Sequence, residues 1–394
     1  MRFLEDAHFE GKRVLVRVDF NVPLNAQFEI TDDTRLAATL PTLRYILAQG
    51  GALVLMSHFG RPKNREAKYS LVHVRAYLEK ALARQVLFAP DCIGQEAERL
   101  SQNLKSGEVL LLENVRYYTE ETQNDPAFAQ ALARHGEIYV NDAFGAAHRA
   151  HASTTGVAKY FTEKICGKVM QAEIENANKV LEKAERPFTA IMGGAKISDK
   201  ILIIEKLLPK IDHLIIGGGM AYTFFKAKGW EIGKSLLEAD KVEVAAELLK
   251  KAQEMGVTIH LPQDSVVAEA FSNESPYQQL PSDALPADKM GLDIGSAAQA
   301  DFAKLIHNSK TLLWNGPMGV FEMPNFAKGT AAIAKSVVEA TQKGAFSLIG
   351  GGDSAAAIKQ MGAAQSVSYV STGGGALLEY MEGKILPGVA ALMD

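Results

Sequence analysis

AFSLIGGGDSAAAIKQMG, residues 345–362, is the stretch that decides the fold class of this chain of 394 residues. The apolar run AFSLI is typical of a strand, and the alanine-rich segment after the glycines is typical of a helix. Gly350, Gly352 and Ala355 fit the G-x-G-x-x-A spacing found where a strand turns into a helix beneath a dinucleotide. Asp353, however, puts a carboxylate where a pyrophosphate needs hydrogen-bond donors. The stretch therefore predicts a βα unit with a phosphate site, and it leaves the kind of ligand open.

The same alternation of short apolar runs and helical stretches covers nearly the whole chain. A helix is expected at residues 34–49, ended by Gly50 and Gly51. Strands are expected at RVLVRV (13–18), ALVLMSH, QVLFAP, EVLLLEN, EIYVNDAF, FTAIMGG, HLIIGG, VTIHLP, TLLWNG, AFSLIGG and VSYVST. This rhythm predicts an α/β fold with two doubly wound, Rossmann-like parallel sheets, one in each half of the chain.

The segment CGKVMQAEIENANKVLEKAERP, residues 166–187, lies between the two halves. It has a helical pattern with a polar face, and it is expected to end before Pro187. We interpret it as a rigid helix that connects two domains; the alternative is one more helix that covers a sheet. Residues 273–289 are expected to be a solvent-exposed excursion with no assignable role.

Composition excludes several classes of protein. Lys and Arg number 42 against 46 Asp and Glu, so the net charge of −4 gives no general attraction to nucleic acid or membranes. No apolar run approaches the ~20 residues needed to span a bilayer. The opening MRFLEDAHFEGKR has no signal-peptide pattern, and Cys92 and Cys166 form neither a CxxC pair nor a disulfide framework. The chain is therefore expected to be a soluble cytoplasmic protein without nucleic-acid or membrane partners.

Basic side chains recur just after the predicted strands of the first half. Ligands of open α/β sheets bind beyond the carboxyl ends of the strands, and arginine suits phosphate and carboxylate groups. The loops in question carry Asp19, Asn21 and Arg35; His58 and Arg61; Arg116; and His148, Arg149 and His151. This pattern predicts a pocket for a small, multiply charged anion, with scattered surface charge as the alternative.

The second half contains a different set of candidate phosphate ligands. MGGAKISDK places Lys196 and Lys200 four residues apart at an expected helix start, where an anion could relieve their repulsion. The order of residues is not that of a Walker A loop, and IIGGGMAY does not fit the dinucleotide spacing. WNGPMGVFE, residues 314–322, is a glycine-punctuated loop with Asn315 and Glu322, and its glycines are expected to let the backbone approach a ligand.

The dinucleotide hypothesis for GGGDSA requires an acid at the end of the next strand, to bind the ribose hydroxyls. That strand, SVSYV, ends in STGGG, which contains no acid. Mg²⁺ explains Asp353 better, because this ion takes one or two carboxylates together with phosphate oxygens and water. GGGDSA is therefore interpreted as a metal–nucleotide loop.

At this point the motifs resemble those of a known family. RVDFNVP, DDTRL, SHFGRP, LLENVRYY, NDAFGAAHRAH, GGAKISDKI, IIGGGMAYTF, LPQD, LLWNGPMGVFE, GGGDS and STGGGA together resemble the phosphoglycerate kinase family, in its order and over nearly the whole chain. The resemblance implies a two-lobed, monomeric enzyme of glycolysis. It implies reversible, Mg²⁺-dependent phosphoryl transfer between ATP and 3-phosphoglycerate, which forms ADP and 1,3-bisphosphoglycerate.

The resemblance also implies roles for individual residues. Arg35 matches the arginine assigned to the transferring phosphoryl group, and with Lys200 it is the catalytic candidate. The phosphoglycerate site matches Asp19, Asn21, Arg35, His58, Arg61, Arg116 and Arg149. The nucleotide site matches Lys196, Lys200, Asn315, Glu322, Gly350, Gly351, Gly352, Asp353 and Ser354, with Asp353 as the Mg²⁺ ligand. Ser354 stands where many family members have threonine, and both residues carry a hydroxyl.

The resemblance further implies the domain organisation and leaves two alternatives. The C-terminal EGKILPGVAALMD resembles a segment that returns to the first lobe. The expected phosphoglycerate domain is therefore 1–168 joined by 380–394, the hinge helix is 169–186, and the nucleotide domain is 187–379. The alternatives are a non-catalytic sensor of nucleotide or sugar phosphate on the same scaffold, and an NAD-dependent dehydrogenase.

Overall fold

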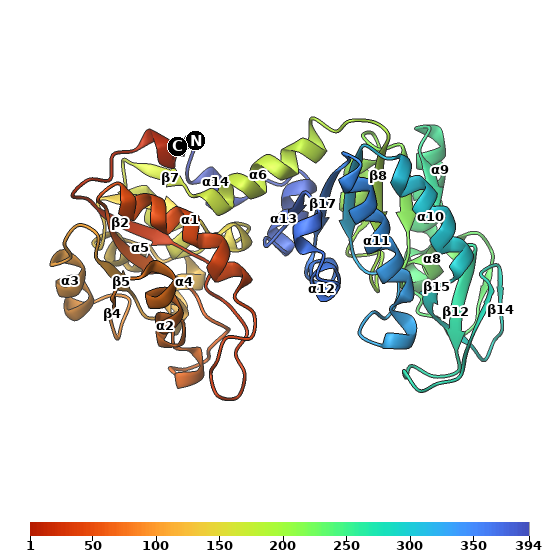
Figure 1. The fold of residues 1–394 in the computed structure, drawn as a ribbon, viewed down its shortest axis with the longest axis horizontal. Coiled ribbons are helices and arrows are strands. Elements are labelled where there is room, and N and C mark those ends of the chain that lie inside the picture. The colour runs from red at the N-terminus through yellow and green to blue at the C-terminus, as the bar shows by residue number, and fades with distance from the viewer. Residues whose placement is uncertain (394) are drawn as a thin grey trace. The chain divides into compact units, whose positions relative to one another are not determined.

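The computed structural model describes residues 1–393, which divide into two compact units (Figure 1). Unit 1 consists of residues 1–175 together with residues 384–393, and unit 2 consists of residues 176–383. Unit 1 is therefore built from two separate segments of the chain. Gly388 joins the second segment to the first, because its N–H donates to the carbonyl of Ala147 at 2.8 Å.

Unit 1 is built on a sheet of seven parallel strands in the order β1-β7-β6-β2-β3-β5-β4. The strands are β1 (Arg2–Phe3), β2 (Arg13–Arg17), β3 (Ala52–Met56), β4 (Val86–Phe88), β5 (Val109–Leu111), β6 (Ile138–Asn141) and β7 (Lys164–Cys166). From β2 the chain adds strands first on one side and later on the other. The strand order therefore reverses between β2 and β6, and this reversal is the position at which open α/β sheets bind ligands.

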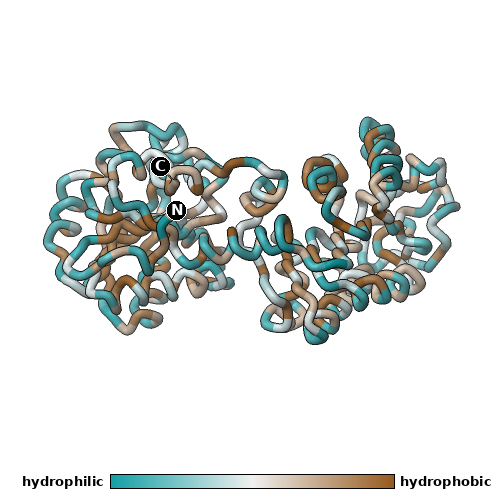
Figure 2. The backbone as a smooth tube through the Cα atoms, turned by 90° about the horizontal axis from the view of Figure 1, so that it is seen from above, coloured by the Kyte–Doolittle hydropathy of each residue, from teal (hydrophilic) through white to brown (hydrophobic). Residues whose placement is uncertain are grey.

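The helices of unit 1 bury their apolar faces against this sheet. They are α1 (Thr34–Ala48), α2 (Val72–Leu82), α3 (Gln95–Gln102), α4 (Thr119–Gln123), α5 (Pro126–Ala133) and α14 (Pro387–Ala390). Apolar side chains of β2 and β3 pack with those of α1 and α2 in one core. Figure 2 shows the corresponding hydrophobic stretches in the interior of the unit. The expected helix at 34–49 is confirmed to within one residue at its end.

Unit 2 contains a second all-parallel sheet, in the order β11-β9-β8-β16-β17-β18. Its strands are β8 (Phe188–Met192), β9 (His213–Ile216), β11 (Thr258–His260), β16 (Thr311–Asn315), β17 (Phe346–Gly350) and β18 (Tyr369–Val370). The helices are α7 (Ile201–Leu207), α8 (Ala221–Ala227), α9 (Val242–Glu254), α10 (Ser296–Asn308), α11 (Lys328–Gln342), α12 (Gly352–Gln360) and α13 (Gly375–Met381). The strand order reverses between β8 and β16. The predicted α/β class with two parallel sheets is confirmed.

Residues 273–289, expected as a solvent-exposed excursion, are largely exposed in β13 but also form strands. They supply β13 (Tyr277–Pro281) and β14 (Ala284–Leu285). Strand β13 pairs with β12 (Asp264–Ala268), which also pairs with β15 (Met290–Ile294), so that a three-stranded antiparallel sheet forms. Strand β14 pairs with β10 (Glu231–Ile232). Strand β13 could not be predicted from the sequence. Four of its five residues are exposed, so it lacks the alternation of apolar and polar side chains that indicates a strand.

The expected helix at 166–187 is shorter than predicted at both ends. Cys166 ends β7, and helix α6 spans Lys168–Leu181. The buried carboxylate of Asp142 accepts from the N–H groups of Val169, at 2.8 Å, and Met170, at 3.3 Å, and so caps the first turn. The helix stops six residues before Pro187. Lys210 contributes to this end, because its Nζ binds the carbonyl oxygen of Leu181 at 2.6 Å.

A search of the described residues finds no helix with the length and hydropathy that crossing a bilayer requires.

Candidate active site

The point of strand reversal in unit 1 gathers the basic residues that the sequence singled out. Strands β6, β2, β3 and β5 are neighbours and run in parallel, so the loops that follow them meet at one edge of the sheet. These loops carry Asp19 and Asn21, His58 and Arg61, Arg116, and Arg149. Arg35 joins them from the first turn of α1, which begins at Thr34.

Arg17, the last residue of β2, lies beneath this group and is fully buried. Its Nε donates to the hydroxyl of Ser153 at 2.7 Å, and an Nη1 hydrogen bond reaches the carbonyl of Val18. Its Nη2 lies 3.2 Å from Nδ1 of His58. The same serine hydroxyl donates to the buried Glu121 at 2.6 Å. The carboxylate of Glu121 therefore compensates the charge of Arg17 through this hydroxyl and not by direct contact.

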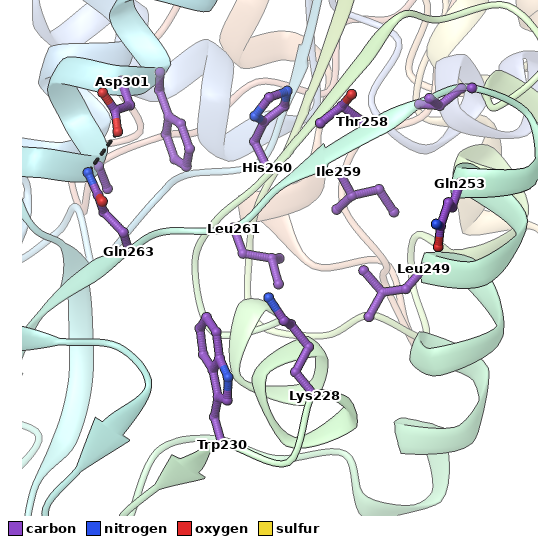
Figure 3. Close-up of a pocket in the computed structure, with 14 residues that line it drawn as sticks. Lys228, Trp230, Leu249, Gln253, Thr258, Ile259, His260, Leu261, Gln263 and Asp301 are labelled. Atoms are coloured by element: carbon purple, nitrogen blue, oxygen red, sulfur yellow. Dashed lines mark hydrogen bonds between the residues drawn. The ribbon is translucent and has the colours of Figure 1, made fainter.

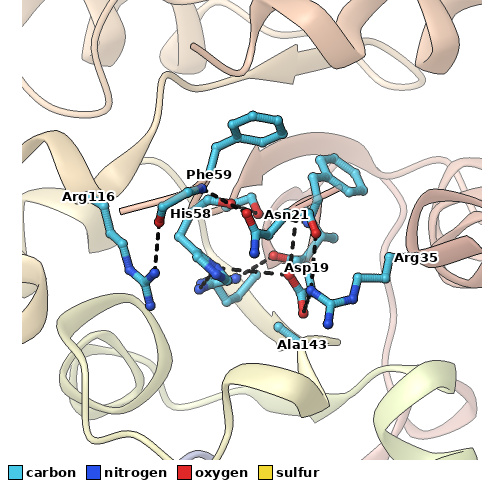
Figure 4. A network of polar contacts seen from close by, with 12 residues as sticks. Asp19, Asn21, Arg35, His58, Phe59, Arg116 and Ala143 are labelled. Atoms are coloured by element: carbon cyan, nitrogen blue, oxygen red, sulfur yellow. Dashed lines mark hydrogen bonds and ion pairs between the residues drawn. The ribbon is translucent and has the colours of Figure 1, made fainter. Parts of the chain in front are cut away.

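Asp19 and Asn21 hold Arg35 in place, and Asp19 also lies next to His58 (Figure 4). A carboxylate oxygen of Asp19 lies 3.3 Å from Nη1 of Arg35 and the other lies 4.0 Å from Nδ1 of His58. The backbone carbonyl of Asn21 accepts from the same Nη1 of Arg35 at 3.1 Å, and its side-chain oxygen accepts from the N–H of Gly60 at 2.8 Å. Arg35 is thus held at its inner end, while its side chain remains 35% exposed.

Arg116 is held by Gly60 from the other side of the group. Its Nη1 donates to the carbonyl of Gly60 at 2.9 Å, and its buried Nε has no hydrogen-bond partner among residues 1–393. Burial, and then repulsion by Arg17 and Arg149, lower the pKa of Arg116 to about 10. A guanidinium with a depressed pKa and an unpaired donor is prepared for an anion.

The two histidines of the group respond to the same positive field. Burial lowers the pKa of His58 well below its usual range, and the nearby Arg17 and Arg116 lower it further. Burial together with Arg116 and Arg17 lowers the pKa of His151 to about 4. Both rings are therefore neutral near pH 7, and they serve as hydrogen-bonding groups rather than charges.

Arg149 and Arg61 complete the group. Nε of Arg149 donates to Nε2 of His148 at 3.1 Å. Arg61 is exposed, and among the described residues it makes no hydrogen bond or ion pair. The charges of Arg17, Arg35, Arg116 and Arg149 all act on His58, and that of Arg61 acts on Arg116, so five guanidinium groups are gathered here against the carboxylates of Asp19 and the buried Glu121. The local excess of positive charge fits a small anion that carries more than one negative charge.

The strand reversal in unit 2 gathers the second set. The ammonium of Lys200 binds the side-chain oxygen of Asn315 at the end of β16. Burial lowers the pKa of Lys200, with the opposing charges of Asp199 and Asp353 reducing the shift. Asn315 is buried, and its Nδ2 has no hydrogen-bond partner in the described part of the chain. An ammonium and an unpaired amide donor are therefore brought together at one side chain, that of Asn315, at the end of β16.

The predicted helix start is confirmed for Lys200, which is the N-cap of α7, but not for Lys196. Helix α7 begins only at Ile201, and Lys200 precedes it in a turn closed by its own N–H, which donates to the carbonyl of Ile197 at 2.8 Å. Lys196 lies in the preceding loop and is exposed. The expected repulsion between helix positions four apart therefore does not occur, and Lys200 alone points to the end of β16.

The glycines of WNGPMG were expected to admit a ligand, but the structure gives a different reason for two of them. Gly316 has φ +102°, and a methyl group on it would overlap the carbonyl of Gly193 in the loop after β8. A methyl group on Gly319 would overlap the carboxylate of Asp293. Gly316 thus lets the loops after β8 and β16 pack directly against each other, and Gly319 lets the loop after β16 pack against Asp293 of β15.

The GGGDS segment begins α12 and is the part of the site with open space. Gly351 has φ +86°, which favours glycine, and a methyl group on Gly352 would meet no protein atom within 4 Å. The hydroxyl of the buried Ser354 accepts from the N–H of Gly316 at 2.6 Å and ties the helix to the loop after β16. Asp353 is exposed beside them.

A cavity of about 420 Å³ within unit 2 extends from this segment. Asp353 and Glu322 both line it, so these two predicted residues share one pocket. Its apolar wall consists of side chains that the sequence did not single out: Tyr222, Phe225, Leu236, Phe271, Met290, Leu292, Met318 and Val320. A few polar groups at an apolar cavity are typical of sites for small organic ligands.

Arg17 and His151 show what sequence reasoning missed in unit 1. Arg17 was taken as part of a strand, although a charge inside the apolar run RVLVRV was a signal that the strand end faces a polar site. His151 was noted in the motif but was not assigned to the site. The cavity wall in unit 2 had no comparable signal, because its residues come from segments far apart in the sequence.

Three comparisons with known proteins bear on the identity of these sites. The family model described as phosphoglycerate kinase matches residues 4–384. The chain belongs to the phosphoglycerate kinase family. It is 51% identical over 389 residues to "Phosphoglycerate kinase, cytosolic" of Triticum aestivum, covering 99% of this chain and 97% of that one. The solved phosphoglycerate kinase of Coxiella burnetii matches with a TM-score of 0.89 and 38% identity, covering 99% of this chain and 98% of the other.

A second solved structure, the phosphoglycerate kinase of Pyrococcus horikoshii, matches with a TM-score of 0.85 and 31% identity, over 100% of this chain and 98% of the other. These findings confirm the predicted family and the predicted enzyme class, a kinase. They give no support to a dehydrogenase or to a non-catalytic sensor.

Proposed function

We propose that this chain transfers a phosphoryl group reversibly between ATP and the carboxylate of 3-phosphoglycerate, giving ADP and 1,3-bisphosphoglycerate. The observation that carries the proposal is the group of five arginines at the strand reversal of unit 1, with His58 and Asp19 among them. 3-Phosphoglycerate has a phosphate and a carboxylate at opposite ends, and it would neutralise several of these charges at once. Membership in the phosphoglycerate kinase family supports this substrate over other small anions.

In this proposal, residues of unit 1 bind 3-phosphoglycerate. Arg61, Arg116 and Arg149 bind its phosphate, and Asp19, Asn21 and His58 orient the bound molecule. Arg35 faces the transferring phosphoryl group. The ion pair of Arg35 with Asp19 and its hydrogen bond to the carbonyl of Asn21 both use Nη1 and leave the rest of the guanidinium for the ligand.

Residues of unit 2 bind the nucleotide. Lys200 and the free amide of Asn315 donate to the phosphates, and the open space at Gly352, next to Gly350 and Gly351, admits their oxygens. Glu322 binds at the cavity wall, and Ser354 holds α12 in place. Lys196, exposed in its loop, contributes charge to the phosphates rather than a fixed contact.

Asp353 is the residue proposed to hold Mg²⁺. No group of three or more His, Cys, Asp or Glu side chains that could hold a metal is found in residues 1–393. A single exposed carboxylate at the start of a phosphate-binding helix nevertheless fits Mg²⁺, which takes most of its other ligands from phosphate oxygens and water. When bound, the ion would neutralise charge on the nucleotide phosphates.

The chemistry requires charge stabilisation rather than a general base. The attacking group is the substrate's carboxylate, which is already ionised at pH 7 because carboxyl pKa values lie near ~4. A carboxylate oxygen forms a bond to the γ-phosphorus, the bond to the bridging oxygen breaks, and ADP leaves with that electron pair. Arg35 and Lys200 stabilise the charge that spreads over the three equatorial oxygens, as in other phosphoryl transfers.

Transfer further requires the two bound substrates to meet, since reacting atoms must approach to about 3–3.5 Å. We propose that phosphoglycerate binds to the domain 1–168 with 380–394, nucleotide binds to the domain 187–379, and residues 169–186 act as the hinge. Small-angle scattering should show a smaller radius of gyration with both substrates than with either one. An unchanged radius would refute the hinge.

We also propose that the protein acts as a monomer in the cytoplasm. Relatives in Triticum aestivum and Nicotiana tabacum are named cytosolic, whereas one in Volvox carteri is named chloroplastic. Sedimentation equilibrium at micromolar concentration tests the monomer.

The decisive experiment measures ATP consumption with 3-phosphoglycerate and Mg²⁺, while the acyl phosphate is removed by coupled reduction. Turnover that requires all three components supports the proposal. If both ligands bind but no turnover occurs, the chain is a sensor and the proposed reaction is wrong.

A further inference from the structure

Strand β11 leaves one edge of the sheet in unit 2 open. It is the outermost strand and pairs with β9 alone. The N–H of Thr258 donates to the carbonyl of Asp212 at 3.1 Å, so Thr258 and His260 direct their backbone groups to β9. Because these directions alternate along a strand, the N–H and C=O of Ile259 point outward. No described residue binds them.

A groove of about 770 Å³ lies along this free edge (Figure 3). Side chains alternate between the two faces of a strand, so β11 divides the groove into two compartments. The apolar compartment is formed by Trp230, Leu249, Ile259 and Leu261, which are all partly exposed. The polar compartment, on the other side of the strand, is formed by Thr258, His260, Gln263 and Asp301.

The uncompensated charge in the groove is positive. Nζ of Lys228 lies 4.3 Å from the ring centroid of Trp230, and no described carboxylate forms an ion pair with it. The carboxylate of Asp301, in contrast, is already occupied: it accepts from Gln263 at 2.7 Å and from Lys304 at 2.9 Å. The groove therefore complements an acidic group rather than a basic one.

We propose that this groove binds an extended acidic peptide segment of a partner protein, which adds a strand to the free edge of β11. Ile259 would supply the backbone hydrogen bonds of the added strand. An apolar side chain of the peptide would enter the apolar compartment, and an acidic side chain two residues away would fall on the same face and reach Lys228. Residues between them would face the polar compartment.

The site is separate from the proposed active site. None of the residues that form the groove belongs to the phosphoglycerate or nucleotide sets, so peptide binding goes beyond phosphoryl transfer. Edge strands in natural proteins are usually covered, charged or interrupted, because free edges attract other strands. An open edge flanked by a tryptophan and an unpaired lysine is consistent with a surface that receives a strand.

The test uses an acetylated and amidated peptide of seven residues, in which phenylalanine at position 3 and glutamate at position 5 stand among threonines. The control peptide has the same composition with the two residues adjacent, which places them on opposite faces. The first peptide should bind and slow amide hydrogen exchange at Ile259 by about tenfold, while the control peptide should not. Exchange is measured by NMR on the full chain.

Variants then test the two contacts. Trp230→Ala should weaken binding about 30-fold, as expected for a central aromatic anchor. Lys228→Gln should weaken it about three- to fivefold, and Lys228→Glu should shift the preference to a peptide with lysine in place of glutamate. Lys250→Gln is the matched control, because Lys250 is an exposed lysine of α9 outside the groove. The kinase rate of Lys228→Gln should equal that of the unaltered chain.

Three results would overturn the proposal. One is unchanged exchange at Ile259 with the first peptide at millimolar concentration. Another is equal binding of both peptides. The third is 3-phenylpropionate binding as tightly as the peptide, because the groove would then be a small-molecule site that does not use the strand edge. If Trp230→Ala folds poorly, the change of peptide preference expected for Lys228→Glu still tests the proposal.

Discussion

Replacing Arg35 with alanine separates catalysis from stability. The side chain is 35% exposed and makes one ion pair, at 3.3 Å, and one hydrogen bond to a carbonyl, at 3.1 Å. Ion pairs this exposed contribute at most about 1 kcal/mol to the free energy of unfolding. For a domain of this size, a loss of 1 kcal/mol lowers the Tm by about 2–4 °C.

The rate should respond far more strongly. A positioned donor that stabilises transition-state charge is worth about 10²–10³ in kcat, or roughly 3–4 kcal/mol of activation free energy. Arg35→Ala should therefore reduce kcat in the coupled ATP-consumption assay by that factor. The KM for 3-phosphoglycerate should change much less, because Arg61, Arg116 and Arg149 still bind the substrate's phosphate.

Arg44→Ala is the matched control. Arg44 lies on the same helix, α1, and its guanidinium makes a comparable exposed hydrogen bond, at 2.9 Å to the carbonyl of Ala81. It should leave kcat unchanged and alter the Tm by a similar small amount. A near-normal kcat in Arg35→Ala, or an equal loss in Arg44→Ala, would refute the role assigned to Arg35.

Three further outcomes follow from the geometry of the two sites. Gly316→Ala should destabilise unit 2 by about 1–3 kcal/mol more than Gly344→Ala, since the two glycines share a φ near +100° but only Gly316 has a neighbour that a methyl group would overlap. Ser354→Ala should cost about 1–3 kcal/mol, because it leaves the buried N–H of Gly316 unpaired. In the free protein His151 should titrate by NMR with a midpoint of about 4, and saturating 3-phosphoglycerate should raise that midpoint by neutralising the nearby arginines.

The measurements have internal controls. Both tryptophans, Trp230 and Trp314, lie in unit 2, so intrinsic fluorescence in urea reports the unfolding of that unit. Equal midpoints for Gly316→Ala and Gly344→Ala would contradict the packing argument. Ser336→Ala, whose hydroxyl donates only to a carbonyl of its own helix, should cost far less than Ser354→Ala.

The histidine prediction also fixes a sign for pH dependence. The folded pKa of His151 is below the usual 6.5, so the unfolded chain binds the proton more tightly. Stability contributed by the neutral ring is therefore complete above pH 6.5 and falls as the pH drops toward 4, by at most about 3 kcal/mol. His151→Gln should flatten this part of the stability curve. If the free energy of unfolding falls below pH 6.5 as steeply in His151→Gln as in the unaltered chain, the pKa assigned to His151 is wrong.

Much of the fold could be predicted from the sequence because a buried parallel strand is an uninterrupted apolar run. Apolar runs as short as EVLLLEN and TLLWNG favour a buried strand over other secondary structures, so the sequence predicted these strands. The geometry of parallel sheets then places the loops after neighbouring strands together, which is why the arginines of unit 1 could be grouped without coordinates.

Other features depend on information that the sequence does not carry locally. The ammonium of Lys200 binds Asn315, 115 positions away, and no pattern near Lys200 indicates that partner. Local spacing correctly predicted a helix start at Lys200, but it also placed Lys196 there, and Lys196 lies in the preceding loop. The glycines of WNGPMG were attributed to a ligand for the same reason: the loop that excludes a side chain at Gly316 comes from Gly193, in another strand-end loop.

The two-segment construction of unit 1 has a consequence for synthesis on the ribosome. Helix α14 packs against the turns at Phe144–Ala146 and Ala152–Gly156, which flank Arg149 and His151. The segment 384–393 is made only after all of unit 2, so at about 5–20 residues per second the first segment waits roughly 10–40 s for it. A nascent chain would therefore hold a nearly complete anion pocket whose Arg149 loop is still unsupported. Only a chain that already contains residues 384–393 would therefore give the Arg149 loop its full support.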